Sequence, residues 1–128
     1  MLLMAKILEC IPNFSEGQDE EKIEKIVQPF REIESVKLLD YSADKDHNRL
    51  VVTMIGSPTG LKTSVLEAME IAVDLIDMNE HTGEHPRMGA VDVVPFTPVR
   101  GVNMEEAVEL ANEVAQQAAE KLDLPIYL

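Results

Sequence analysis

The fold is decided by residues 50–76, LVVTMIGSPTGLKTSVLEAMEIAVDLI. The β-branched run from Leu50 to Ile55 predicts a strand, since such side chains pack well on a pleated sheet. Ser57-Pro58 then marks the start of a helix, with proline in the first turn. One face of this helix carries the apolar residues Leu61, Val65, Met69, Ala72 and Ile76. A strand followed directly by a long amphipathic helix is therefore the central unit.

Towards the N-terminus the same pairing of strand and helix is expected. Residues 7–11 are an apolar run that predicts a first strand, and Pro12-Asn13 predicts a turn after it. Asp19 is the expected N-cap of a helix that Pro29 ends near Gln28. The apolar face of this helix is formed by Ile23, Ile26, Val27 and Phe30. Residues 35–41 then predict a second strand and residues 42–48 a polar loop.

Towards the C-terminus the pattern predicts a long loop at residues 78–90, a strand at 91–99, a helix and a last strand at 124–128. The prolines in the first of these strands predict an edge or a bulge. Asn103 and Glu106 form a capping-box pattern at the start of the helix. The helix face expected to be buried consists of Met104, Val108, Ala111, Ala115, Ala118 and Leu122.

The resulting order, β-α-β-β-α-β-α-β, predicts an α+β fold: a ferredoxin-like β-α-β-β-α-β core with an added helix and strand. The helices then cover one face of the sheet. The other face requires a second layer. Because large apolar patches are rare on monomers, we expect a dimer through this face.

The composition fits one cytoplasmic domain that works without nucleic acid or membranes. The chain has 128 residues, enough for a core of its own, and a net charge of −13 that repels phosphate backbones and anionic membranes. Cys10 is the only cysteine, so no internal disulfide is possible. The N-terminal residues do not have the pattern of a signal peptide, and no apolar run is long enough to cross a membrane.

The loop at residues 78–90 contains the motif that could bind a metal. His81-Thr82-Gly83-Glu84-His85 has the letters of inverted zinc peptidases, in which a helix brings both histidines to one face. Here Gly83 interrupts the motif, and Pro86 favours extended backbone at His85. A zinc hydrolase that uses His81, Glu84 and His85 is therefore a weaker alternative, and we expect no metal.

The same loop holds the best candidate for a general acid/base. His85 lies between Glu84 and Arg87, and the ordinary pKa of a histidine is close to the working pH of most enzymes. On the residues alone His81 fits this role equally well, and His47 only slightly less. Asn13-Phe14-Ser15 is a polar turn that could contact a ligand.

Several stretches together resemble the N-terminal subdomain of glutamate formiminotransferase. The resemblance covers nearly the whole chain and rests on residues 9–17 (ECIPNFSEG), 37–40 (KLLD), 48–49 (NR), 75–78 (LIDM), 83–90 (GEHPRMGA), 92–96 (DVVPF) and 98–102 (PVRGV).

This resemblance implies transfer of a formimino group from N-formiminoglutamate to N5 of tetrahydrofolate, or of a formyl group in some bacterial members. It implies His85 as the catalytic acid/base, with Arg87, Asn13 and Arg49 as candidate substrate-binding residues and tetrahydrofolate as co-substrate. A module that keeps the fold and binds folate or assembles without turnover is the alternative.

Two departures bear on the site. Animal members have an aspartate two residues after Leu38-Leu39-Asp40, where this sequence has Ser42, and Asp44 is a possible replacement. The resemblance also implies that a full transferase unit has a C-terminal subdomain facing this one, and we expect this sequence to correspond to the N-terminal subdomain alone. The resemblance thus implies that a second polypeptide or a second copy covers the bare sheet face.

Overall fold

The computed structural model describes residues 6–76 and 90–122. Within these ranges the elements are, in chain order, β1 (Ile7–Cys10), β2 (Asn13–Phe14), α1 (Glu20–Val27), α2 (Pro29–Glu32), β3 (Val36–Asp44), β4 (Arg49–Gly56), α3 (Pro58–Leu75), β5 (Val91–Val93), β6 (Phe96–Arg100) and α4 (Met104–Leu122). The fold class is α+β, as predicted.

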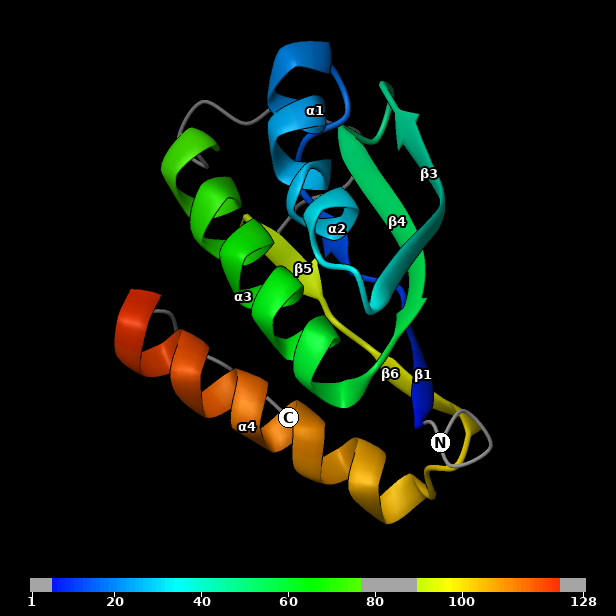
Figure 1. Cartoon of the computed structure of the whole chain (residues 1–128). Coiled ribbons are helices and arrows are strands. Elements are labelled where there is room, and N and C mark those ends of the chain that lie inside the picture. Colours follow the sequence, from blue (N-terminus) through cyan, green and yellow to red (C-terminus); the bar gives the residue numbers. More distant parts are fainter. Residues whose placement is uncertain (1–5, 77–89, 123–128) are drawn as a thin grey trace.

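The sheet is antiparallel and is built around β4. β3 pairs with one side of β4, and β1 and β2 pair with successive parts of its other side. β6 then pairs with β1, and β5 pairs with β2. The strand order is therefore β5-β2-β4-β1-β6, with β3 attached to β4. The helices lie on one side of this sheet (Figure 1). The ferredoxin-like topology stays a prediction, and the expected last strand lies outside the described residues.

The core lies between the helices and one face of the sheet. Burial alternates strictly along β4, so every second residue from Leu50 points towards the helices. Leu50, Val52 and Met54 are fully buried there. The predicted face of α3 is confirmed: Leu61, Val65, Met69, Ala72 and Ile76 are all buried. Packing of these apolar side chains between two layers is the main stabilising contribution to such a fold.

The predicted helix starts are confirmed by their hydrogen bonds. Asp19 Oδ1 accepts from the backbone N–H of Glu21 at 3.0 Å and of Lys22 at 3.3 Å. Ser57 Oγ accepts from Gly60 N at 3.0 Å. Asn103 and Glu106 form the expected capping box, in which Asn103 Oδ1 accepts from Glu106 N at 2.8 Å. Each cap binds an N–H that the helix itself leaves without a partner.

The predicted strand at 91–99 is wrong in one respect, since it consists of two strands that pair with different partners. β5 pairs with β2 and β6 with β1. Val94-Pro95 separates β5 from β6, and the facing residues Ile11-Pro12 separate β1 from β2. A proline has no N–H to give to a ladder, and each of these interruptions contains one, whereas Pro98 is accommodated within the edge strand β6.

Two polar stretches predicted as turn and loop are also strands. Asn13-Phe14 forms β2, and β3 continues through Ser42 to Asp44, so the turn to β4 contains only residues 45–48. The exposed side of a strand can carry polar residues without loss of stability, because the backbone is held by its hydrogen bonds to the neighbouring strand. Ser42 pairs with Val51 and Asp44 with Arg49.

The predicted face of α4 is partly wrong. Met104 and Val108 are 63% and 51% exposed. The residues buried against the rest of the fold are Ala107, Leu110, Val114 and Ala118. α4 carries apolar residues on two adjacent stripes, and periodicity alone does not say which stripe meets α3 and β6.

Cys10 lies in the core on β1 and is fully buried. Desolvation by burial is the main cause that raises the pKa of its thiol, and Glu9 raises it further. Since the thiolate is the reactive form, this cysteine is chemically inert in the folded state. In the described residues there is no helix of the length and hydrophobicity that a membrane span requires.

Candidate functional site

The sheet face that points away from the helices is called here the open face. On β4 it is formed by Arg49, Val51, Thr53 and Ile55, which alternate with the buried core residues. Asn13 on β2 and Ser42 on β3 belong to it, because each pairs with Val51. No helix of the described ranges packs on this face (Figure 1). It is therefore the surface on which a ligand or a second layer can bind.

One corner of the open face is polar and is called the polar corner; it consists of Asn13, Ser42, Asp44 and Arg49. Asn13 and Ser42 flank Val51, and the pair Asp44–Arg49 forms the next row along the strands. Asn13 and Arg49 are thus diagonal neighbours on one face, a relation that places residues about 7–8 Å apart. The structure brings together these two residues, both predicted to bind substrate.

Arg49 has the most unusual environment in the polar corner. Its Nε is buried and has no hydrogen-bond partner. None of the ion pairs found within residues 6–76 and 90–122 includes Arg49. A buried donor without a partner costs free energy and is rare in folded proteins. In a chain with net charge −13, an unpaired guanidinium is a suitable site for an anion.

Asn13 is held by its own turn. Its Nδ2 donates to the backbone carbonyl of Ile11 at 3.3 Å. This bond fixes the orientation of the amide, and its Oδ1 is left to accept a hydrogen bond on the open face. Asn13 can therefore accept from an N–H group of a ligand through Oδ1, and the second N–H of Nδ2 can donate to an acceptor.

Asp44 and His47 form a pair in the turn between β3 and β4. His47 Nδ1 lies 2.6 Å from Asp44 Oδ2. Asp44 Oδ1 accepts from the backbone N–H of Asp46 at 3.0 Å and of His47 at 3.2 Å. The hydrogen bond from the His47 side chain, followed by that from its backbone, lowers the pKa of Asp44 from its ordinary value. The carboxylate of Asp44 is thus committed to the turn.

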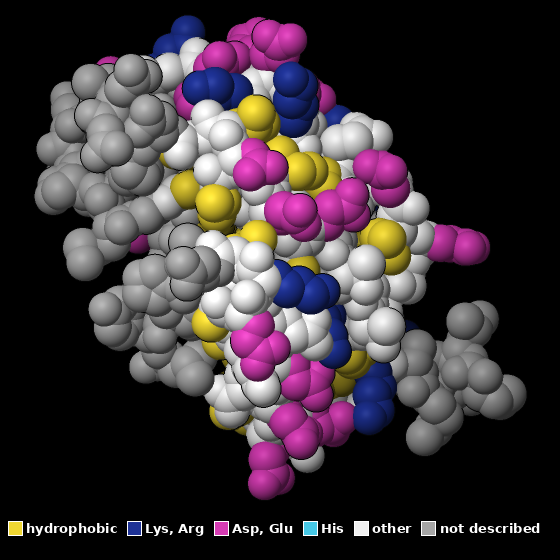
Figure 2. Space-filling model, turned by 90° about the vertical axis from the view of Figure 1, so that its left-hand side faces the viewer, with side chains coloured by type: hydrophobic (Ala, Val, Ile, Leu, Met, Phe, Trp, Pro, Cys, Tyr) yellow, Lys and Arg dark blue, Asp and Glu magenta, His cyan; other side chains and the backbone are white. Residues whose placement is uncertain are grey.

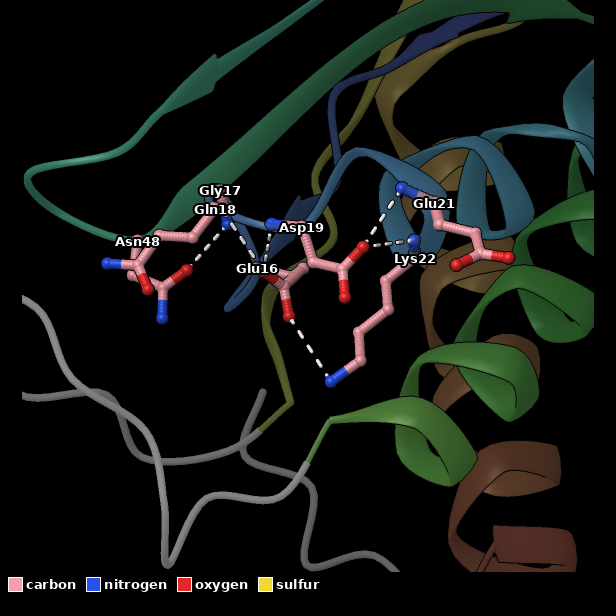
Figure 3. A network of polar contacts seen from close by, with 7 residues as sticks. All are labelled: Glu16, Gly17, Gln18, Asp19, Glu21, Lys22 and Asn48. Atoms are coloured by element: carbon pink, nitrogen blue, oxygen red, sulfur yellow. Dashed lines mark hydrogen bonds and ion pairs between the residues drawn. The ribbon is translucent and has the colours of Figure 1, made fainter.

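The turn is tied to the segment between β2 and α1 by a network of polar contacts (Figure 3). Asn48 Oδ1 accepts from Gly17 N at 2.7 Å, and Gln18 Nε2 donates to Lys45 O at 3.0 Å. Gly17 is packed so closely that a Cβ there would lie 2.5 Å from Asp44 O and 2.6 Å from Arg49 N. The position of the turn, and with it the polar corner, is set by these contacts.

The buried side chain of Glu16 holds the segment between β2 and α1 through hydrogen bonds to its backbone. This residue is 6% exposed, and its Oε2 accepts from Asp19 N at 2.9 Å and from Gln18 N at 3.1 Å. Its Oε1 lies 3.9 Å from Lys22 Nζ (Figure 3). A buried carboxylate is tolerated when it accepts several N–H bonds and faces a cation.

Sequence reasoning did not predict the roles of Glu16 and Asn48. Asn48 has a φ of 50°, a left-handed conformation that asparagine adopts more readily than most residues. An asparagine just before a strand is a signal for such a turn. No comparable signal identifies Glu16, because its partners are defined only by the packing of the segment.

His85, Arg87, His81 and Glu84 lie outside the described residues. The described residues resume at Ala90. Its carbonyl accepts from Ser15 N at 2.9 Å, next to β2. Within residues 6–76 and 90–122 there is no group of three or more potential metal ligands. The zinc alternative concerns residues that this search did not include.

The helical side of the molecule is less suited to bind an anionic substrate. Acidic side chains are spread over it (Figure 2). A groove of about 350 Å³ lies there, lined mainly by apolar atoms of residues such as Pro29, Ile71 and Leu75. It is on the opposite side of the sheet from the polar corner. The unpaired cation and the groove are therefore separate features.

Fold and site together define a small α+β unit with helices on one sheet face and a polar corner on the other. Residues 7–128 match the family described as formiminotransferase domain, N-terminal subdomain. The chain belongs to this family.

Relatives come from bacteria, archaea and animals. The chain is 46% identical over 125 residues to a glutamate formimidoyltransferase of Streptococcus pyogenes, covering 98% of this chain and 42% of that protein. It is 38% identical over 122 residues to one of Thermoplasma acidophilum, covering 95% and 40%. It is 47% identical over 125 residues to the formimidoyltransferase-cyclodeaminase of Rattus norvegicus, covering 98% and 23%. The chain thus spans less than half the length of these relatives.

Proposed function

We propose that this chain is the N-terminal catalytic subdomain of a folate-dependent formiminotransferase. It transfers a formimino group from N-formiminoglutamate, or a formyl group from the corresponding N-formyl donor, to N5 of tetrahydrofolate. The observation that carries this proposal is the unpaired Arg49 guanidinium beside Asn13 on the open face, in a chain of this family. Formiminoglutamate carries two carboxylates, and tetrahydrofolate has a carboxylate tail and several N–H groups.

The proposed acid/base is His85. During transfer, N5 of tetrahydrofolate attacks the formimino carbon and loses a proton, while the departing nitrogen of glutamate gains one. One imidazole can accept the first proton and donate the second. His85 precedes Ala90 by five positions, and an extended chain over five positions spans at most about 18 Å. A histidine at position 85 therefore has the polar corner within reach.

The proposed roles of the other residues follow from charge and hydrogen bonding. Arg49 and Arg87 anchor carboxylates, because a guanidinium binds both oxygens of a carboxylate at once. Asn13 accepts a hydrogen bond from an N–H of the substrate through Oδ1. Tetrahydrofolate acts as co-substrate, and no step of this reaction requires a metal.

The role of Arg49 can be tested by calorimetry with N-formimino-L-glutamate. Arg49→Ala is expected to weaken binding by about 10- to 100-fold, the usual loss when a charge-assisted hydrogen bond is removed. Arg49→Lys, which keeps the charge but not the two parallel hydrogen bonds, is expected to give an intermediate loss. Equal affinity of the alanine variant and the unchanged chain would contradict the proposal, as would no binding by the unchanged chain at millimolar concentration.

We also propose that a second folded unit covers the open face, either another copy of this chain or a separate C-terminal subdomain. The open face includes the half-buried Val51 and Ile55, and Val93 and Val99 are exposed by 50% and 58%. A second layer stabilises a sheet of this kind because it buries the apolar side chains that would otherwise face water.

The chain alone is expected to form a dimer through this face. Light scattering at increasing protein concentration should then give twice the mass of one chain. Val51→Lys, which places a charge in the middle of the face, should shift the equilibrium to monomer. A monomer at all concentrations would contradict the proposed dimer.

A further inference from the structure

Arg49 and Asp44 stand opposite each other on β4 and β3, yet they form no ion pair. They are direct partners in the register of the two strands. Residues in this relation have Cβ atoms about 4.5–5.5 Å apart on the same face, and opposite charges so placed attract each other. Arg49 nevertheless takes part in none of the ion pairs of the described chain, and its Nε has no partner.

The contacts of Asp44 explain this. All of its hydrogen bonds are directed into the turn, two from the backbone of Asp46 and His47 to Oδ1 and one from His47 Nδ1 to Oδ2. The imidazole contact at 2.6 Å is the shortest of the three. It occupies Oδ2, the oxygen that would otherwise be left to pair with Arg49. The two backbone bonds hold the other oxygen of the same planar carboxylate, so the imidazole adds the restraint that acts on Oδ2 itself.

We propose that His47 is a positioning residue that holds the carboxylate of Asp44 in the turn and so keeps Arg49 available for a carboxylate of the substrate. Without the imidazole, Asp44 Oδ2 becomes a competitor of the substrate for the same guanidinium. The second half of this inference rests on the proposed function, in which Arg49 binds a substrate carboxylate. The first half concerns only Asp44, His47 and Arg49 and can be tested without any ligand.

The ligand-free test uses the side-chain Nε–H resonance of Arg49 in ¹⁵N-labelled protein, assigned by its loss in Arg49→Lys. In His47→Ala this resonance is expected to shift and to exchange with water more slowly, because the guanidinium now pairs with Asp44. In the double variant His47→Ala, Asp44→Asn the resonance should return close to its original position. If His47→Ala leaves the Arg49 resonance unchanged, the inference is overturned.

The ligand test measures binding of N-formimino-L-glutamate to the same variants by calorimetry. His47→Ala should weaken binding by about 2- to 5-fold, the value of one exposed ion pair. The double variant should bind as well as the unchanged chain, or better, because the competing charge is gone. A merely structural role of His47 predicts the opposite, since the imidazole is still missing in the double variant and binding would stay as weak as in His47→Ala.

Asp44→Asn alone is the matched control. Its Oδ1 still accepts from the backbone of Asp46 and His47, so the turn is kept, and its midpoint of thermal unfolding should stay close to that of the unchanged chain. If the unchanged chain binds no formiminoglutamate, the proposed function fails, but the Arg49 resonance still decides whether His47 restrains Asp44. If binding is normal and the double variant stays as weak as His47→Ala, the inference fails while the proposed function stands.

Discussion

Replacing His85 with alanine is expected to lower kcat for formimino transfer by about 10²- to 10⁴-fold, the usual contribution of a general acid/base. The proton on N5 of tetrahydrofolate and the one needed by the leaving glutamate nitrogen then have to be exchanged with water. Binding should change little, because the imidazole acts on protons that move only during the reaction. The measurement is formimino transfer to tetrahydrofolate, with a formiminotransferase C-terminal subdomain supplied, and substrate affinity in parallel.

Two variants control this experiment. His81→Ala changes the other histidine of the same segment and should retain most of the activity, whereas the zinc alternative requires both histidines. His85→Gln keeps a hydrogen-bonding group of similar size but cannot exchange the proton, so it should be as slow as the alanine variant. Full activity of His85→Ala would refute the proposed role. Binding without transfer by the unchanged protein would favour the non-catalytic alternative.

Replacing Gly17 with alanine is expected to reduce the free energy of unfolding by about 3 kcal/mol, at the upper end of the usual cost of overpacking. A Cβ at this position would lie 2.5 Å from Asp44 O and 2.6 Å and 2.7 Å from the N and O atoms of Arg49. All three are backbone atoms of paired strands, which cannot move aside like the end of a side chain. Urea unfolding followed by circular dichroism measures the loss.

Gly60→Ala is the matched control for this substitution. A Cβ on Gly60 would lie 2.2 Å from Ser35 Oγ, which can rotate away, 2.9 Å from Oγ of the helix cap Ser57 and 3.0 Å from Val36 Cγ2, all of them side-chain atoms rather than backbone. Gly60 lies inside α3, where alanine is preferred to glycine by about 1 kcal/mol. The control should therefore lose much less stability. An equal loss in both variants would show that the contact with the β3–β4 turn has no special importance.

Local signals predicted much of the fold. Asp19, Ser57 and the pair Asn103–Glu106 begin their helices as expected, since capping depends on neighbouring residues only. The exact face of α4 was not predictable, because two apolar stripes compete and the choice is made by α3 and β6. The interruption at Pro95 became clear only with the register, which places it opposite the one at Pro12.

The sequence predicted candidate residues of the site, but it did not predict how they lie relative to one another. Asn13 and Arg49 were both candidates, but they are 36 positions apart in the sequence. Their neighbourhood follows from the pairing of β2 with β4, which no local pattern specifies. The hydrogen bond between Asp44 and His47 was not predictable either. Residues 42–44 are polar, and they form a strand only because they pair with β4.

The inert thiol in the interior has a practical consequence for spectroscopy. Since Cys10 is the only cysteine and is fully buried, a cysteine introduced at Ser42 would be the one thiol that reacts rapidly with a maleimide dye. A fluorophore can thus be attached in the polar corner without first removing a native cysteine, and its emission can report arrival of a ligand or of a second layer in real time.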